Sequence, residues 1–306
     1  MNLIGVRTGE QKSEKSEYFV IIRDSGGISM QIKTVKAVYF SPVANTKKVV
    51  EAAAKVMAFQ LSVPMEVLDF TLPAARTHSY SFGSDELVVF GVPTYAGRVP
   101  NKVLPFVKEL FHGEETPAVP IVTFGNRNYD DSLAELRNEM EHNGFRTFAA
   151  AAFSCRHVFS NKINMLRPDQ ADMKVLSEFA EKAAQKLKDA RKTEDLGSPV
   201  QVKGNDPVGP YYRPLGTDGQ PAVFLKAKPL TNPERCDECG LCAEVCPLGS
   251  IDPKDVYSVP GVCIKCMACV RKCPQRAKYF EDEAFLSHIA MLDQNYTKRK
   301  EPEVFI

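Results

Sequence analysis

Hydrophobic residues between Val35 and Ala190 follow two alternating patterns. Short, almost wholly apolar runs predict buried β-strands, and longer segments with an apolar residue every three or four positions predict amphipathic helices. Strands this apolar are expected where helices cover both faces of a sheet. The alternation therefore predicts an α/β domain built on a parallel sheet. We expect strands at residues 35–40, 65–70, 86–91, 119–124 and 145–153, and helices at residues 46–60, 101–110, 132–143 and 169–190.

This pattern stops after Ala190. Residues 197–233 contain seven prolines and five glycines in 37 residues, a density typical of a linker or a wrapping loop. Two tyrosines and Phe224 in this segment indicate that it packs against another part of the molecule. We expect an N-terminal extension (1–34), an α/β domain (35–190), a Pro/Gly-rich linker (191–229) and a small cysteine-rich unit with a C-terminal tail (230–306).

The first 29 residues contain the charged run EQKSEKSE and predict no function. One alternative is that translation starts at Met30, because Gly26 and Gly27 require G-rich codons where a bacterial ribosome-binding site would lie. The first thirty residues also lack the apolar core of a signal peptide.

Charge and hydropathy exclude several classes of partner. The chain has 39 Lys and Arg against 38 Asp and Glu, so no excess positive charge is available for a phosphate backbone, and we expect no nucleic-acid partner. No run approaches the roughly eighteen consecutive apolar residues of a membrane-spanning helix. We therefore expect no membrane insertion and a cytoplasmic location.

Eight of the nine cysteines lie between Cys236 and Cys273. They form two copies of the spacing C-x2-C-x2-C-x3-C-P, in CDECGLCAEVCP and CIKCMACVRKCP. Clustered cysteines in a reducing compartment indicate metal binding, and this spacing lets three thiolates of one tight loop reach three irons of a cubane cluster. Zinc is the alternative, but zinc sites use two pairs of cysteines without the third closely spaced thiolate and the following proline.

Residues 230–285 resemble clostridial-type two-cluster ferredoxins on the strength of these two motifs. The resemblance implies that the fourth cysteine of each motif binds the cluster held by the other motif. It gives one cluster the ligands Cys236, Cys239, Cys242 and Cys273, and the other cluster the ligands Cys246, Cys263, Cys266 and Cys269.

Three loops that follow predicted strands carry candidate ligand-binding residues. The first, YFSPVANTKKV, opens a helix and contains Ser41, Asn45 and Thr46, whose hydroxyls and backbone N–H groups suit a phosphate. Alternatively, Asn45 or Thr46 is simply the N-cap of that helix. The second and third loops, GVPTYAGRVP and FGNRNYDDSL, contain glycine and aromatic residues at the strand ends where open α/β sheets bind ligands.

These three loops resemble the FMN site of flavodoxins across residues 35–190. The resemblance implies a doubly wound, five-stranded parallel sheet followed by a small α+β two-cluster ferredoxin domain. It also implies that FMN binds to Ser41, Asn45, Thr46, Pro93, Thr94, Tyr95, Gly97, Gly125, Asn126 and Tyr129. In this interpretation the first three residues hold the phosphate, the next four flank the ring, and the last three cover its other side.

The first loop departs from the flavodoxin pattern T-G-T-G-N-T. Its sequence S-P-V-A-N-T places Pro42 where a donor N–H would be, and Ala44 where a glycine is common. The chain has no tryptophan, so a ring-stacking residue must be a tyrosine, with Tyr95 the first candidate and Tyr129 the second. Arg98 is expected at the flavin or at a partner's acidic surface, with a solvated loop residue as the alternative.

Other residues with reactive side chains receive less specific interpretations. Cys155 is expected to be a small apolar residue at the end of the fifth strand, although the neighbouring His157 raises the alternative of a Cys/His nucleophile. His142 is expected at the surface of a helix. Arg127, in the third loop, is expected at the flavin or at a partner's acidic surface, with a solvated loop residue as the alternative.

Taken whole, the chain resembles the flavodoxin–ferredoxin fusion proteins of anaerobic bacteria. The resemblance implies an intracellular electron carrier with two [4Fe–4S] clusters and FMN, which passes electrons between a low-potential donor and an acceptor enzyme through redox partner proteins. The alternatives are a flavin-dependent reductase that acts directly on a small substrate, a ferredoxin with a flavin-free docking domain, and a redox-sensing regulator. No G-x-G-x-x-G follows a predicted strand, so the sequence gives no support for a nicotinamide site.

Overall fold

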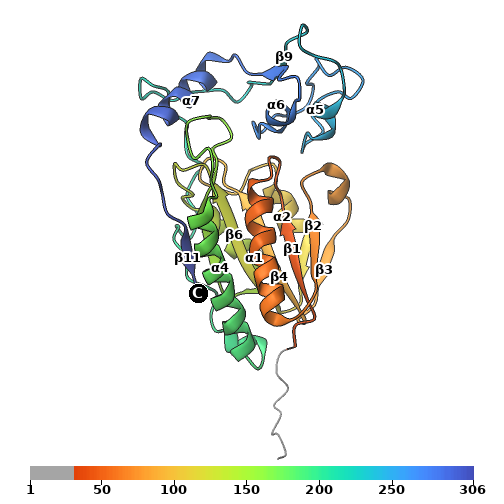
Figure 1. The fold of residues 1–306 in the computed structure, drawn as a ribbon, viewed down its shortest axis with the longest axis vertical. Coiled ribbons are helices and arrows are strands. Elements are labelled where there is room, and N and C mark those ends of the chain that lie inside the picture. Colours follow the sequence, from red (N-terminus) through yellow and green to blue (C-terminus); the bar gives the residue numbers. More distant parts are fainter. Residues whose placement is uncertain (1–30) are drawn as a thin grey trace, which may run out of the picture.

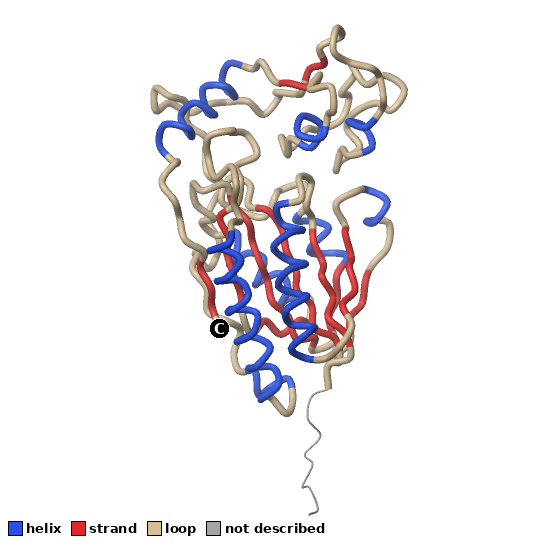
Figure 2. The backbone as a smooth tube through the Cα atoms, in the orientation of Figure 1, coloured by secondary structure: helices blue, strands red, loops and turns tan. Residues whose placement is uncertain are grey.

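The computed structural model describes residues 31–306, so the interpretations of residues 1–29 and of Met30 lie outside the described residues. A parallel sheet forms the centre of the α/β domain (Figures 1 and 2), with the strand order β2-β1-β4-β6-β8. This order is that of a flavodoxin-like doubly wound sheet, as predicted. The five strands are β1 (Thr34–Tyr39), β2 (Met65–Asp69), β4 (Glu86–Pro93), β6 (Thr116–Phe124) and β8 (Ala150–Ser154).

Helices cover both faces of this sheet and bury two separate apolar cores. Helices α1 (Asn45–Leu61) and α4 (Gln170–Asp189) pack on one face, and α2 (Leu104–Leu110) and α3 (Ser132–His142) pack on the other. Strand β6 is buried at every position, which explains its continuous apolar sequence. His142 is exposed, as predicted. Within residues 31–306, no helix combines the length and apolar character that crossing a membrane requires.

The predicted strand 145–153 is two strands, β7 (Phe145–Thr147) and β8, which is a correction to the sequence interpretation. Both pair with β6, but the register changes from Ala118 opposite Thr147 to Ile121 opposite Ala151. Three residues of one strand therefore face two of the other, which is a β-bulge. The bulge lies opposite Pro120, whose missing N–H cannot pair with a neighbouring strand.

The cysteine-rich unit lies beyond the carboxyl ends of the parallel strands (Figure 1). Its helix α7 spans Glu283–Asn295. Its other elements are short, as expected for a unit that metal sites hold together. They are β9 (Leu230–Thr231), α5 (Leu241–Glu244), α6 (Ala268–Lys272) and β10 (Lys278–Tyr279). The α/β domain adds the short elements η1 (Pro73–Arg76), β3 (Tyr80–Phe82) and β5 (Phe111–Gly113), and η2 (Thr193–Leu196) follows it.

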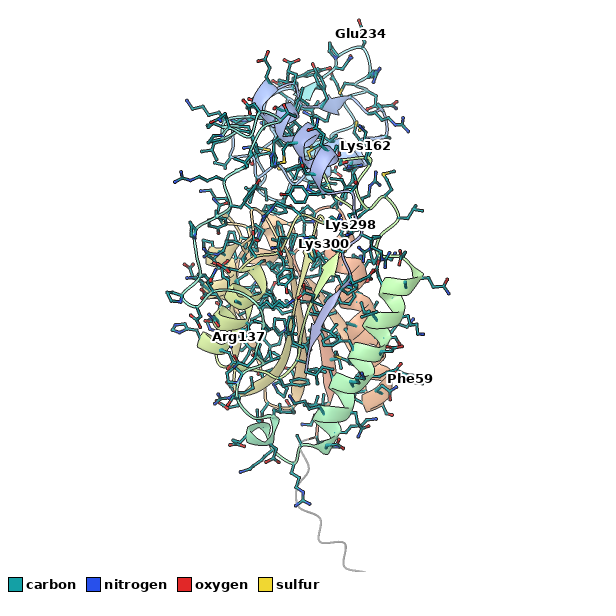
Figure 3. All side chains as sticks on the ribbon, turned by 90° about the vertical axis from the view of Figure 1, so that its left-hand side faces the viewer. Phe59, Arg137, Lys162, Glu234, Lys298 and Lys300 are labelled. Atoms are coloured by element: carbon teal, nitrogen blue, oxygen red, sulfur yellow. The ribbon has the colours of Figure 1, made fainter. Side chains whose placement is uncertain are left out.

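Residues 296–305, here called the C-terminal strap, return from α7 to the α/β domain. The strap ends in β11 (Glu303–Phe305), which pairs antiparallel with β8 and brings the sheet to seven strands. Lys298 and Lys300 of the strap lie between the two units in Figure 3. The tail of the predicted C-terminal unit is therefore part of the first domain's sheet.

The Pro/Gly-rich linker wraps over the α/β domain, as its aromatic residues indicated. The carboxylate of Asp131 accepts hydrogen bonds from the backbone N–H groups of Asn205 (2.8 Å) and Gly209 (2.7 Å). The backbone N–H of Tyr212 donates to the carbonyl of Ala96 at 2.8 Å. These contacts hold the linker against the loops that follow β4 and β6, where the ligand site was predicted.

Candidate functional site

The two cysteine motifs adopt the same backbone conformation. In each motif the residues on either side of the second cysteine are left-handed, with φ of 56° and 77° at Glu238 and Gly240, and 55° and 64° at Lys265 and Met267. Only the first motif has a glycine at one of these positions. The shared conformation turns the loop tightly, so that three cysteines of each motif come to one side of it.

Backbone N–H groups donate hydrogen bonds to cysteine sulfurs in both motifs. Such bonds favour a negatively charged sulfur and are a common feature of iron–sulfur ligands. The donors and acceptors are Ser250 to Cys246 Sγ (3.2 Å), Lys265 to Cys263 Sγ (3.4 Å) and Ala277 to Cys273 Sγ (3.3 Å).

Each of two small cavities is lined by four of the eight cysteines, three from one motif and the fourth from the other. The four thiols of each set surround an open space. Among residues 31–306, no three His, Cys, Asp or Glu side chains lie close enough together to hold a single metal ion. The structure thus brings together the two sets that the ferredoxin resemblance implied. The inner site contains Cys246, Cys263, Cys266 and Cys269, and the outer site contains Cys236, Cys239, Cys242 and Cys273.

A larger cavity of about 220 Å³, measured as the space open to the centre of a water molecule, lies between the α/β domain and the cysteine-rich unit. Loops after β1, β4, β6 and β8 form its lower wall, and the linker and the cysteine-rich unit complete it. Eight of the ten predicted FMN residues line it. They are Ser41, Asn45, Thr46, Pro93, Thr94, Tyr95, Gly97 and Gly125.

The first helix opens toward this cavity without a side-chain cap. Ala44 is the N-cap, in a left-handed conformation with φ of 67°. The amide of Asn45 instead donates to the carbonyl of Arg156 (2.8 Å), and the hydroxyl of Thr46 bonds that of Thr123 (2.8 Å). The N-cap interpretation of Asn45 and Thr46 is therefore wrong. Their backbone N–H groups make no hydrogen bond within residues 31–306, so they are available to an anion.

The second loop also presents polar atoms suited to a flavin. The hydroxyl of Thr94 is buried and has no hydrogen-bond partner among the described residues. Tyr95 is half-buried, and desolvation together with the nearby Cys266 and Cys263 raises its pKa well above the usual value. A buried orphan hydroxyl beside uncapped helix N–H groups fits a ligand with a polar ring edge and a phosphate, as FMN has.

Sequence families bear directly on the cysteine sites. A family profile described as "4Fe-4S binding domain" matches residues 229–252, and a second profile with the same description matches residues 260–279. The two matches contain all eight motif cysteines. The C-terminal unit is a 4Fe–4S ferredoxin-type domain. No curated protein sequence matches the chain.

Solved structures similar to the chain include flavodoxins. A flavodoxin from the domain Archaea is 15% identical over 51% of this chain and 99% of its own, with a TM-score of 0.37. A mutant of a flavodoxin from Pseudomonas aeruginosa is 15% identical over 50% of this chain and 99% of its own, with a TM-score of 0.32. Rubredoxin oxygen:oxidoreductase from Desulfovibrio gigas is 16% identical over 55% of this chain and 38% of its own, with a TM-score of 0.38.

Two predicted flavin residues, Asn126 and Tyr129, do not line the large cavity, which corrects their expected placement. Asn126 is fully buried, and its amide donates to the carbonyls of Tyr296 and Lys298 in the C-terminal strap. The hydroxyl of Tyr129 donates to the carboxylate of Glu303 at 2.8 Å. Both side chains therefore hold the strap.

Several cavity residues were missed because they lie outside the three predicted loops. The linker supplies Tyr212 and Phe224, and the ferredoxin-type unit supplies Ile264, Lys265 and His288. The aromatic residues of the linker were a visible signal, since they implied packing on something. The other three gave no signal, because the way in which the second cysteine motif and α7 face the first domain depends on the docking of the two units.

Two buried titratable groups at the cavity, Cys155 and His157, are held neutral. Burial lowers the pKa of His157 to about 4, with His288 as a smaller contribution, and burial raises the pKa of Cys155 to about 12. The Nδ1 atom of His157 accepts the backbone N–H of Phe159 at 3.1 Å. A thiolate–imidazolium pair is thus disfavoured, which supports the interpretation of Cys155 as a small core residue.

The two loop arginines have protein partners. Arg98 forms an ion pair with Glu135 and stacks on the ring of Tyr211 at 4.9 Å, so it anchors the linker and does not line the cavity. Arg127 does line the cavity, where its guanidinium lies 3.9 Å from the ring centroid of Tyr212. Of the two, only Arg127 can contact a molecule bound there.

Proposed function

We propose that this protein carries electrons between FMN, bound in the large cavity, and two [4Fe–4S] clusters at the inner and outer sites, and exchanges them with redox partner proteins. One observation carries the proposal. Ile264 lines both the large cavity and the inner site, so the two spaces share part of a wall. FMN accepts or donates one or two electrons, whereas each cluster accepts one.

The residues of this chain would hold and shield the flavin. The N–H groups of Asn45 and Thr46 are placed for the phosphate, and the hydroxyl of Thr94 for a polar atom of the ring. Phe224 and Tyr212 of the linker close the cavity with aromatic surface. Such walls keep water away from the ring and reduce the reorganisation that an electron transfer requires.

The outer site is the exit toward a partner. Cys239 is exposed, whereas Cys266 and Cys269 of the inner site are buried. Glu234, near the outer motif, lies at the end of the molecule farthest from the flavodoxin-like domain in Figure 3. Electrons would thus pass between the cavity, the inner site and the outer site in that order.

The test uses anaerobically prepared protein loaded with FMN, iron and sulfide. Cluster reduction by a rapidly generated one-electron reductant should be followed by flavin reduction at a rate that is independent of protein concentration. A rate proportional to protein concentration would contradict the proposal, because it would mean transfer between molecules. A chain that binds about eight irons per molecule but no FMN would instead support a flavin-free docking domain.

A further inference from the structure

Four Lys or Arg side chains are buried in the described part of the chain, and they differ in their partners. Arg167 forms an ion pair with the buried carboxylate of Asp172. The other three, Arg76 (9% exposed), Lys265 (8%) and Lys278 (3%), form no ion pair with any residue from 31 to 306. A buried cation without an anion is costly, so the missing negative charge must come from elsewhere.

These three cations donate only to backbone carbonyls. The guanidinium of Arg76 stands over the ring of Phe106 at 4.6 Å, and its Nε and Nη1 atoms have no acceptor among the described residues. Burial accordingly lowers the pKa of Arg76. The acceptors are Pro247 O for Arg76, Leu225 O (2.6 Å) and Cys263 O (3.1 Å) for Lys265, and Val256 O for Lys278.

Lys278 lines a cysteine site, and Arg76 and Lys265 each donate to a backbone carbonyl at the inner site. Pro247 directly follows Cys246 and lines the inner site, so Arg76 reaches that site from the flavodoxin-like domain. Lys265 lies between two inner ligands in sequence, and Lys278 lines the outer site. Four thiolates and a cluster make each site anionic, and reduction adds one further negative charge. A cluster bound at each site would supply the negative charge that these cations lack.

We propose that Arg76 is a counter-charge of the inner site and raises the reduction potential of the cluster held there, with Lys265 acting from the ferredoxin-type unit. Reduction of the inner site adds one electron, forms and breaks no covalent bond, and increases the negative charge that the guanidinium stabilises. The inference rests on the iron–sulfur part of the proposed function and not on FMN. Docking of the two units would thus help to set the reduction potential of the inner cluster in the ferredoxin-type unit.

The test is a potentiometric titration of the anaerobic, iron-loaded full chain, followed by the electron paramagnetic resonance of the reduced clusters. Cys246→Ser, which replaces one inner ligand, assigns the two midpoints. In Arg76→Gln the inner midpoint should fall by an amount equal to roughly a tenfold shift in the reduction equilibrium, which is about 59 mV for one electron. The outer midpoint should stay unchanged and serves as an internal reference.

Two matched variants separate charge from structure. Arg76→Lys keeps the charge and should keep the inner midpoint near that of the unchanged protein. Arg146→Gln removes an exposed arginine of the same domain, whose ion pair is with Glu115, and should move neither midpoint.

Three results would overturn the proposal: an unchanged inner midpoint in Arg76→Gln, an equal fall in Arg76→Lys, or an equal fall of both midpoints. Should Arg76→Gln fail to retain iron, Lys265→Met takes its place. This second variant should also lower the inner midpoint. An unchanged inner midpoint in Lys265→Met would likewise overturn the proposal.

Discussion

Two hydroxyl groups near the flavin loops have opposite surroundings. The Thr94 hydroxyl is buried beside the cavity without a partner among the described residues, whereas the Tyr129 hydroxyl is bonded to Glu303 and its ring packs on Phe124 with centroids 5.4 Å apart. A buried hydroxyl without a partner destabilises the ligand-free protein, and a ligand that bonds it removes that penalty. The two residues therefore allow a matched comparison.

Thr94→Val and Tyr129→Phe each remove one hydroxyl group and little else. Thr94→Val should weaken FMN binding about two- to tenfold, the range expected for one lost hydrogen bond, and should not lower the stability of the ligand-free protein. Tyr129→Phe should leave FMN binding unchanged. Titration of FMN fluorescence measures both dissociation constants, and an equal loss in the two variants would restore Tyr129 to the flavin site.

For residues with local constraints, the sequence predicted which side chains the structure places together at a cavity. The cysteines are fixed by their spacing, and the loops at Ser41 and Thr94 by the strands that precede them. The sequence did not predict that Asn126 and Tyr129 contact the strap, because their partners, Tyr296 to Glu303, lie about 170 positions later in the chain. No local pattern reports a contact over such a separation.

At the scale of elements, the edge of the sheet depends on β11. Val304 lies opposite Ala151 of β8, and no other strand covers this side of β8 within residues 31–306. An uncovered edge strand exposes a row of unpaired N–H and C=O groups. The strap therefore stabilises the flavodoxin-like domain and also connects it to α7.

Deletion of residues 303–306 should lower the free energy of unfolding by about 2–4 kcal/mol, since it removes the β11 ladder and the bond from Tyr129. Hydrogen exchange should accelerate at those amides of β8 that face β11. Val304→Thr, which alters only a partly exposed side chain, serves as the control and should leave exchange unchanged. Unaltered protection of the β8 amides from hydrogen exchange in the deletion variant would show that pairing with β11 does not stabilise β8.

The elements that the sequence predicted well are those with a long periodic pattern. Helix α4 begins and ends within one residue of its predicted bounds, whereas α2 begins at Leu104, three residues later than expected. Pro105 lies in the first turn of α2 and favours a helix that starts there. The bulge between β7 and β8 was not visible, because a change of register is a property of two strands together.

At the scale of the whole molecule, ligand binding should couple the two units. The large cavity takes residues from the flavodoxin-like domain, the linker and the ferredoxin-type unit, so a molecule bound there contacts all three. A ligand that binds only the folded state stabilises whatever must be folded to form its site. Binding of FMN is therefore expected to stabilise both units.

FMN at about one hundred times its dissociation constant should raise stability by about 2.7 kcal/mol. Thermal unfolding of the iron-loaded protein, followed by far-ultraviolet circular dichroism and by the visible absorption of the clusters, should move to higher temperature at both signals. Thr94→Val should show a smaller shift at the same FMN concentration. A shift confined to the circular dichroism signal would mean that the units respond independently.

The return of the strap to β8 also has a consequence during synthesis on the ribosome. Glu303 pairs with Ala152, so the sheet of the first domain stays incomplete until about 150 further residues have been made. At translation rates of about 5–20 residues per second, this interval lasts roughly 8–30 s. During its first part, the cavity-lining loops of the first domain have been made but residues 212–292, which complete the wall of the large cavity, have not. The nascent chain therefore offers a ligand an open route into the site before the cavity closes.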